Sequence, residues 1–216
     1  PRMTGKINDK PQVGVVNGLA VYGPNMGSLL DIEIIAIPTE KEGTINITGI
    51  VEEESLGSSG RSLRRKSTAR GSIENALTVL RSMGVNASNF DIHVNFPGGI
   101  PVDGPSAGIA MTLGIYSAIY NIPINHLVAM TGEISIHGLV KPVGGIYPKV
   151  LAAKKAGCKT IIIPKDNMQA MLESIEGIEI IPVAKFNEVL PIALCMDLAK
   201  QQTIDIVLDK LRKESV

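Results

Sequence analysis

The chain contains no tryptophan and few other aromatic residues, three Phe and four Tyr among 216 residues. Its 21 lysines and arginines balance 21 aspartates and glutamates, so the formal net charge is zero. Such a protein offers neither a sequence-wide positive field nor many rings on which nucleic-acid bases can stack. The composition therefore argues against a dedicated nucleic-acid-binding protein and against attraction to anionic lipid.

Cysteine is equally scarce. Cys158 and Cys195 are the only two in the sequence, and they are neither spaced as CxxC nor dense enough for a secreted disulfide scaffold. They are interpreted as free thiols in a reducing compartment. The fold needs no disulfide or metal staple, because 44% of the residues are apolar and a chain of this size buries on the order of 70% of its unfolded surface. The chain shows no signal peptide and begins with Pro1, as expected of a piece excised from a longer polypeptide.

Residues 104–132 lack Asp, Glu, Lys and Arg, which makes this stretch long enough for a membrane span of about 20 residues. However, Pro123 and the polar residues Asn121, Asn125 and His126 interrupt it. A buried helix followed by a buried strand is the better interpretation.

The apolar periodicity predicts one mixed sheet with helices, a fold of the α/β or α+β class. The first fifty residues read as a β-meander, with strands at 12–22, 31–37 and 44–51. Later strands are expected at 90–96, 127–131, 160–163 and 178–182, and helices at 72–84, 105–120, 146–156, 166–175 and 193–213.

The expected organisation is a polar tail at 1–11, one domain at 12–195, and a C-terminal helix at 196–216 that packs on the domain or trails it. An apolar stripe is predicted on that helix, formed by Ile204, Val207, Leu208 and Leu211.

A basic run rich in Ser and Gly separates the expected meander from the first helix, at residues 56–72. It is interpreted as a solvated loop, with a contact surface for an acidic partner as the alternative. No acidic residue falls among its basic ones, which are Arg61, Arg64, Arg65, Lys66 and Arg70.

The loop at 96–108 concentrates Gly and Pro between a strand and a helix, an arrangement that either turns a corner or builds a site. It misses the phosphate-binding P-loop pattern, because Pro105 occupies the lysine position. It formally matches the GxSxG elbow of hydrolases around Ser106, but only His126 and His137 follow as histidines, which makes that match weak. A phosphate loop of the GHMP-type small-molecule kinases remains the enzyme alternative.

Ser106 is the candidate nucleophile. It is expected at the start of the buried helix, where the amides of Ser106 and Ala107 would lack intrahelical partners and so could stabilise an oxyanion. The alternative is an ordinary first-turn or capping serine.

Lys149 is the candidate base, because a lysine can take a proton when apolar surroundings disfavour its charged form. On the helix expected at 146–156 it shares a face with Ala152, Ala153 and Ala156, whereas its neighbouring lysines lie on the opposite side. The alternative is a surface lysine in the first turn of that helix.

Several motifs follow one another in a fixed order. They are Asp103-Gly-Pro-Ser106-Ala-Gly108, Thr131-Gly-Glu133, Gly138-x-Val140-x-Pro142-Val-Gly144-Gly145, Lys149-Val-Leu-Ala-Ala-Lys-Lys-Ala-Gly157-x-Lys159-Thr160 and Ile163-Pro164. Together they resemble the proteolytic domain of the Lon family of ATP-dependent proteases. The resemblance spans residues 12–195 and is most specific over 93–164.

This resemblance implies a Ser-Lys dyad, with Ser106 as nucleophile and Lys149 as general base. It further implies that Thr131 orients the lysine amine and that Glu133 supports the site. His93 matches the first His of the strand upstream of the bacterial motif.

The chain also departs from the bacterial pattern. Asn95 stands where bacterial members carry a second His, so no His-Asp relay is implied, and Val102 replaces the Lys before Asp103. Asp103 itself has two readings: a helix N-cap, or a latch that pairs with Lys149 while the site is idle.

The fold that the resemblance implies is an α/β fold with a βαβ crossover, shared with certain ribosomal proteins and the GHMP-type kinases, and the implied assembly is a ring of six subunits. The chain contains no Walker A or Walker B motif. ATP and Mg²⁺ are therefore expected in an ATPase portion outside this sequence, and no cofactor or metal is expected within it.

The implied activity is that of an endopeptidase acting on unfolded or damaged proteins in the cytoplasm, with its own ATPase domain as partner and no need for nucleic acid. Archaeal members carry membrane-spanning segments in the ATPase part, so membrane attachment of the parent protein is an open alternative. Two other functions stay in consideration: a GHMP-type kinase that binds ATP by itself, and a catalytically idle Lon-like assembly domain.

Overall fold

The computed structural model describes residues 5–49, 68–98 and 102–214. The strands in this part of the chain are β1 (Val15–Tyr22), β2 (Met26–Pro38), β3 (Ile45–Thr48), β4 (Phe90–Asn95), β5 (Val128–Met130), β6 (Glu133–Ile134), β7 (Val140–Lys141), β8 (Thr160–Pro164) and β9 (Glu179–Val183).

Helices alternate with the later strands, as predicted for a mixed α/β fold. The α-helices are α1 (Thr68–Ser82), α2 (Gly108–Tyr120), α3 (Ile146–Ala156), α4 (Ala170–Glu173), α5 (Val189–Ala193) and α6 (Met196–Glu214). Short 3₁₀ turns are η1 (Ala87–Asn89), η2 (Pro105–Ala107), η3 (Lys165–Asn167) and η4 (Phe186–Glu188).

Among the described residues, seven strands form one mixed sheet in the order β3-β4-β2-β1-β5-β8-β9, and β6 pairs with β7 in a separate hairpin. The strands β1, β5, β8 and β9 are mutually parallel, and α3 connects β5 to β8 as a βαβ crossover. This crossover carries the predicted helix 146–156, whose bounds the structure reproduces.

The predicted β-meander is wrong at its third strand. β1 and β2 form the expected antiparallel hairpin, but β4 occupies the other edge of β2, and β3 lies beyond it, parallel to β4. The reason is burial: Ile92 and Val94 of β4 extend the buried face that Ile34 provides on β2. The four residues of β3 bury too little to hold a central position, so β3 lies at the edge.

The two faces of the sheet are covered by different helices, because successive side chains of a strand point to opposite faces. On β2, Leu30 and Ile32 belong to the larger core cluster, which includes residues of α1 and α2. Leu29 belongs to the smaller cluster, which α3 and α4 complete. Ser106 directly precedes α2 and Lys149 lies on α3, helices from opposite sides of the sheet, so the two can come together only beyond the strand ends.

The uncharged stretch forms η2, α2 and β5, as the interpretation of a buried helix followed by a buried strand predicted. Asn121 ends α2 in the left-handed conformation, with a φ of 54°. Every helix in the described part of the chain is too short or too polar to cross a membrane. Both cysteines are free thiols, Cys158 buried and Cys195 half-buried.

The helix predicted at 166–175 is wrong in extent, because the structure has only η3 and the short α4 there. Asn167 explains the break. Its side chain accepts a hydrogen bond from the Val143 amide at 2.8 Å and donates one to the Val143 carbonyl at 2.9 Å. This pairing turns Asn167 inward, and Met168 leaves the helical path for an extended conformation.

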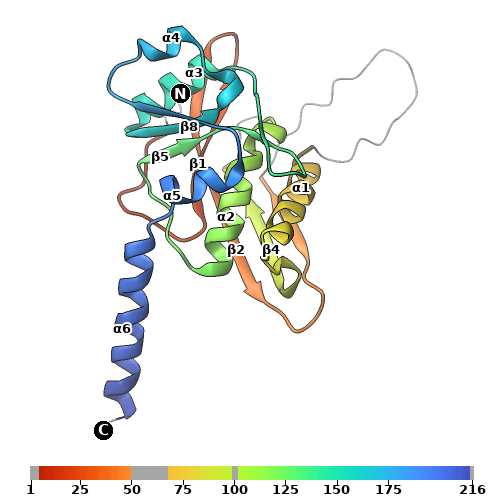
Figure 1. Cartoon of the computed structure of the whole chain (residues 1–216), viewed down its shortest axis with the longest axis vertical. Helices are drawn as coiled ribbons and strands as arrows, with labels where there is room; N and C mark the ends of the chain where they lie inside the picture. The colour runs from red at the N-terminus through yellow and green to blue at the C-terminus, as the bar shows by residue number, and fades with distance from the viewer. Residues whose placement is uncertain (1–4, 50–67, 99–101, 215–216) are drawn as a thin grey trace, which may run out of the picture.

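Two helices begin a few residues away from their predicted first residues. Helix α1 begins at Thr68 rather than 72, and α6 begins at Met196 because Leu194 is extended. Figure 1 shows α6 projecting away from the body of the domain, where Ile204 is 51% exposed. Of the predicted stripe, the side chains of Val207, Leu208 and Leu211 lie outside the described residues. The basic run lies outside them as well, at 61–67, apart from Arg70 in α1.

Candidate active site

Ser106 lies in the 3₁₀ turn η2, directly before α2, and its side chain is 2% exposed. Its Oγ donates a hydrogen bond to the backbone carbonyl of Asp103 at 2.9 Å, and its amide donates to the same carbonyl at 3.1 Å. The serine is therefore at the start of the buried helix, as predicted, with its hydroxyl directed to its own loop.

Lys149 lies in the first turn of α3 and is only 3% exposed, so the reading as a surface lysine is wrong. Its Nζ donates a hydrogen bond to Thr131 Oγ1 at 3.3 Å. Thr131 is fully buried just after β5. The predicted contact between Thr131 and the lysine amine is present.

Thr131 also connects the lysine to the serine. Its Oγ1 lies 3.4 Å from the Ser106 carbonyl and donates to it, and the next amide, that of Gly132, donates to the same carbonyl at 3.0 Å. Three separate segments, η2, the end of β5 and α3, thus bring Ser106, Thr131 and Lys149 to one place.

The environment of Lys149 alters its acidity. Burial lowers the pKa of its amine from the ordinary 10.5 to about 8, and the negative charge of Asp103 opposes that shift. Neutral and charged amine therefore coexist near pH 8, which is the condition for a general base in neutral or mildly alkaline solution.

Asp103 does not act as a helix N-cap, so that reading is wrong. The residue preceding η2 is Gly104, and neither η2 nor α2 has a side-chain cap. The Asp103 side chain is exposed, and only its backbone carbonyl takes part in the turn, as the acceptor from Ser106.

The oxyanion prediction assumed that the amides of Ser106 and Ala107 have no partners, and this premise is wrong. The Ser106 amide donates to the Asp103 carbonyl, and the Ala107 amide donates to the Gly104 carbonyl at 3.3 Å. The cause is local: the chain continues the helix backwards as a 3₁₀ turn, and i→i+3 bonds occupy donors that an abrupt helix start would leave free.

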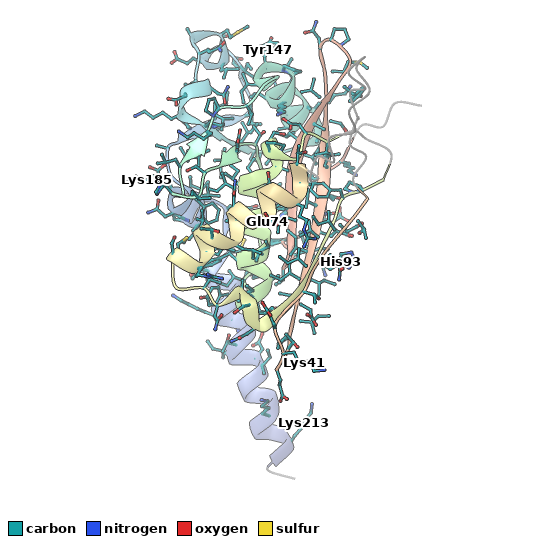
Figure 2. The ribbon with its side chains drawn as sticks, turned by 90° about the vertical axis from the view of Figure 1, so that its right-hand side faces the viewer. Lys41, Glu74, His93, Tyr147, Lys185 and Lys213 are labelled. Atoms are coloured by element: carbon teal, nitrogen blue, oxygen red, sulfur yellow. The ribbon has the colours of Figure 1, made fainter. Side chains whose placement is uncertain are left out.

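Two predicted supporting residues are exposed. Glu133 is exposed in the β6–β7 hairpin, opposite Lys141. His93 is exposed on β4, with its Nε2 2.9 Å from Thr48 Oγ1. Its neighbours Ile92 and Val94 are buried, so strand alternation turns His93 to the opposite face. Figure 2 shows His93 well separated from Tyr147, which lies two residues before Lys149.

The sequence patterns gave no role to Gly27, which lets the helix that carries Lys149 approach the sheet. A Cβ at Gly27 of β2 would lie 2.3 Å from the Pro148 carbonyl oxygen and 3.0 Å from Ala152 Cβ. Glycine here allows the first turn of α3 to approach the strand closely. The available signal was a glycine inside a strand pattern, which marks close backbone approach.

If Lys149 acts in catalysis, Gly27→Ala is expected to lower kcat/KM by about a hundredfold, because a displacement of about 1 Å misaligns a catalytic group. The free energy of unfolding should fall by about 1–3 kcal/mol through overpacking. Steady-state kinetics and thermal unfolding measure the two effects. Gly71→Ala in α1 is the matched control, since nothing lies within 4 Å of a Cβ at that position, and it should leave kcat/KM unchanged. Equal kinetics in the two variants would contradict the role of Gly27.

The described residues contain no group of three or more His, Cys, Asp or Glu side chains placed to hold a metal ion.

Comparison with known proteins gives a consistent result. The family model of the Lon protease (S16) C-terminal proteolytic domain matches residues 2–196. "Lon protease 2" of Bacillus subtilis (strain 168) is 59% identical over 216 residues, which is 100% of this chain and 39% of that protein. "Archaeal Lon protease" of Archaeoglobus fulgidus is 39% identical over 191 residues, 85% of this chain and 28% of that protein.

A further relative, "Lon protease" of Vibrio parahaemolyticus, is 40% identical over 205 residues, 89% of this chain and 24% of that protein. The chain thus spans between about a quarter and two fifths of the length of these relatives. The matched residues of the family model end where α6 begins.

Proposed function

The chain belongs to the Lon protease family as its C-terminal proteolytic domain, and from this premise we propose that it hydrolyses peptide bonds with a dyad of Ser106 and Lys149. The observation that carries the proposal is the burial of Lys149 with its amine on Thr131, which in turn contacts the Ser106 backbone. A buried lysine with a lowered pKa, held beside a helix-start serine, is the arrangement that this chemistry requires.

In the proposed first step, the neutral amine of Lys149 takes the proton of Ser106 while Oγ attacks the carbonyl carbon of the scissile peptide bond. One N–H of the amine stays on Thr131 Oγ1, which leaves the nitrogen lone pair for the serine hydroxyl. The carbonyl oxygen becomes an oxyanion and Lys149 becomes an ammonium. When the C–N bond breaks, the ammonium returns its proton to the leaving amine.

The second half of the reaction repeats the first with water. Lys149 takes a proton from a water molecule, whose oxygen attacks the acyl carbon. The ester bond to Ser106 Oγ breaks, the ammonium protonates the serine oxygen, and the carboxylic acid product leaves. Serine and neutral lysine are both regenerated, so protons and bonds balance over the cycle.

The arrangement described here has the properties of a resting state. The Ser106 hydroxyl is bound to the Asp103 carbonyl, the amides of Ser106 and Ala107 are occupied within the turn, and the charge of Asp103 favours the protonated lysine. We propose that opening of the turn after Asp103 removes all three obstacles together. The serine then rotates to Lys149, and the two amides become available to the oxyanion.

Asp103→Asn is expected to lower the pKa of Lys149 further, because the charge that stabilises its ammonium is gone while the backbone carbonyl at this position is kept. The rising limb of kcat/KM should then move to lower pH by a few tenths of a pH unit, since Asp103 is exposed and its field is screened. The shift should shrink at high salt. Peptidase assays across pH measure it.

The matched control is Asp205→Asn, which removes one exposed carboxylate on α6, far along the chain from the site. A pH profile of Asp103→Asn that coincides with that of the control would refute the latch and leave Asp103 as a loop residue only.

A serine-directed covalent label, such as a fluorophosphonate, tests the proposed function directly. Mass spectrometry should find the label on Ser106, and the label should be lost in Ser106→Ala. The kinase alternative instead predicts ATP binding by this chain and no labelled serine, and the idle-domain alternative predicts neither label nor cleavage. The match to a protease family over residues 2–196 favours the first outcome.

For the parent protein, we propose an ATP-dependent protease that acts on unfolded or damaged proteins. The resemblance supports an ATPase portion that uses ATP and Mg²⁺ and lies outside this sequence, a ring of six identical subunits, and a cytoplasmic location. In the full-length protein, degradation of a casein substrate is expected to stop without ATP. Ser106→Ala should abolish degradation even at saturating ATP.

A further inference from the structure

Residues 5–8, here called the N-terminal strap, run from β2 to the end of α3. Gly5 passes so close to β2 that a Cβ there would lie 2.5 Å from the Leu29 carbonyl oxygen. The Ile7 amide donates a hydrogen bond to the Ala156 carbonyl at 3.3 Å, in the last turn of α3. The half-buried Ile7 side chain packs on the core cluster beneath that helix.

The strap has a polar anchor next to this apolar one. The Asn8 side chain lies beside the carboxylate of Asp31 on β2, where it favours the charged form and so opposes the rise in the pKa of that carboxyl. One oxygen of that carboxylate, Oδ1, is buried without a hydrogen-bond partner. Cys158, just beyond α3, lies near enough that the charge of Asp31 adds to the effect of burial in raising the pKa of its thiol to about 11. Asn8, Asp31 and the end of α3 therefore form one contact region.

Helix α3 is thus held against β2 at two points. At its start, Pro148 lies against Gly27. At its end, Ala156 is bound by the strap. Lys149 and Ala156 are seven residues apart, about two helical turns, so they lie on the same face of α3. The strap therefore binds the end of α3, and the buried face of this helix carries both Ala156 and Lys149.

We infer that the N-terminal strap is a positioning element for Lys149: by holding the last turn of α3 on β2, it keeps the amine buried beside Thr131. The inference rests on the proposed role of Lys149 as the base. If an ATPase portion precedes this chain, as proposed, the strap is the segment through which a movement of that portion reaches the lysine. The strap then controls the acidity of the base, because loosening α3 admits water to the amine.

The test compares Ile7→Ala and Asn8→Ala with Lys6→Ala, which changes an exposed side chain of the same strap. The pKa of Lys149 is read directly by NMR titration of the full chain labelled at lysine Cε, in a Ser106→Ala background. Ile7→Ala and Asn8→Ala should each raise that pKa by about one pH unit. In the same variants with Ser106 present, the rising limb of kcat/KM should shift to higher pH by the same amount. Activity at pH values below the limb should then fall about tenfold. In Lys6→Ala, Lys149 should titrate as in the parent. Ile7→Val keeps most of the apolar contact, so the pKa of Lys149 should stay close to its parent value.

A purely structural strap gives a different result: the melting temperature falls in Ile7→Ala and Asn8→Ala, while the titration of Lys149 and the pH profile stay unchanged. That outcome would overturn the inference. The NMR readout does not depend on cleavage, so it separates this failure from failure of the proposed function. Peptide cleavage that persists in Ser106→Ala would refute the dyad while leaving the titration of Lys149 as a test of the strap.

Asp31→Asn separates the contact of Asn8 with the Asp31 side chain from the effect of the Asp31 charge. The variant still offers an oxygen to Asn8, so Lys149 should titrate near pH 8 as before, and a raised value would refute the amide contact as the anchor. Burial and then Glu33 raise the pKa of Asp31 above its ordinary 3.8. The native state therefore loses stability as pH rises from 3.8 through the raised value, and loses nothing below 3.8. The melting temperature of Asp31→Asn should equal that of the parent at low pH, exceed it increasingly through that window, and keep a constant excess above it.

Discussion

Replacement of Lys149 by arginine is expected to lower kcat/KM for peptide cleavage at pH 8 by about a thousandfold or more, as much as replacement by alanine. The guanidinium stays protonated at every pH at which the protein is folded, so it cannot accept the proton of Ser106. Arginine keeps the positive charge and much of the side-chain length. The comparison therefore separates a base from an electrostatic role.

The pH dependence of kcat/KM tests the same role of Lys149. Because burial lowers the pKa of Lys149 to about 8, kcat/KM of the parent should rise through that pH as the amine loses its proton, and then level off. Lys155→Arg, on the exposed side of the same helix, serves as control and should keep both rate and profile. Turnover by Lys149→Arg comparable to that of the control would show that the lysine acts only through its charge.

Ser106→Ala is expected to reduce cleavage to background, a loss of at least about a thousandfold, with little change in stability. The variant removes the nucleophile and one hydrogen bond to the Asp103 carbonyl, which is worth about 1 kcal/mol. Alanine recovers part of that loss as a good helix former in the turn before α2. Peptidase kinetics and thermal unfolding on the same preparations measure both quantities.

Ser174→Ala provides the control, because it removes a hydroxyl that donates to a backbone carbonyl at an exposed position after α4. It should match the parent in rate and differ little in stability. If Ser106→Ala cleaved peptides at the rate of this control, the hydroxyl of Ser106 would have no chemical role. An unfolded Ser106→Ala is recognised by its circular dichroism spectrum, and Ser106→Cys then provides a folded substitute with a different nucleophile.

Much of the fold could be predicted from local patterns. Apolar residues at helical spacing predicted α3 with its observed bounds, since eleven residues closed by Gly157 need no distant partner to define them. The uncharged run around α2 predicted a buried helix for the same reason. Propensity failed where a distant backbone competed: Asn167 pairs with Val143, and the predicted helix 166–175 is broken there.

The candidate site divides in the same way. Residue types and spacing made Ser106 and Lys149 candidates, because a helix-start serine and a lysine on an alanine face are local features. The resemblance to the Lon family then selected them over the alternatives of a capping serine and a surface lysine. The partners of their backbone and side-chain groups were not predictable. The amides of Ser106 and Ala107 are occupied because η2 has 3₁₀ geometry. Gly104 and Pro105 permit this geometry but do not require it.

The sequence by itself determined that this protein is a mixed α/β domain, with a Gly- and Pro-rich loop leading into a buried helix and a lysine on an apolar helical face. These properties follow from periods of two and 3.6 residues, which each segment carries alone. Only the tertiary structure decided that β4 separates β3 from β2, that His93 and Glu133 are exposed, and that the strap meets the end of α3. Those facts depend on which buried surfaces fit together across the sheet, and such a fit is a property of several segments at once.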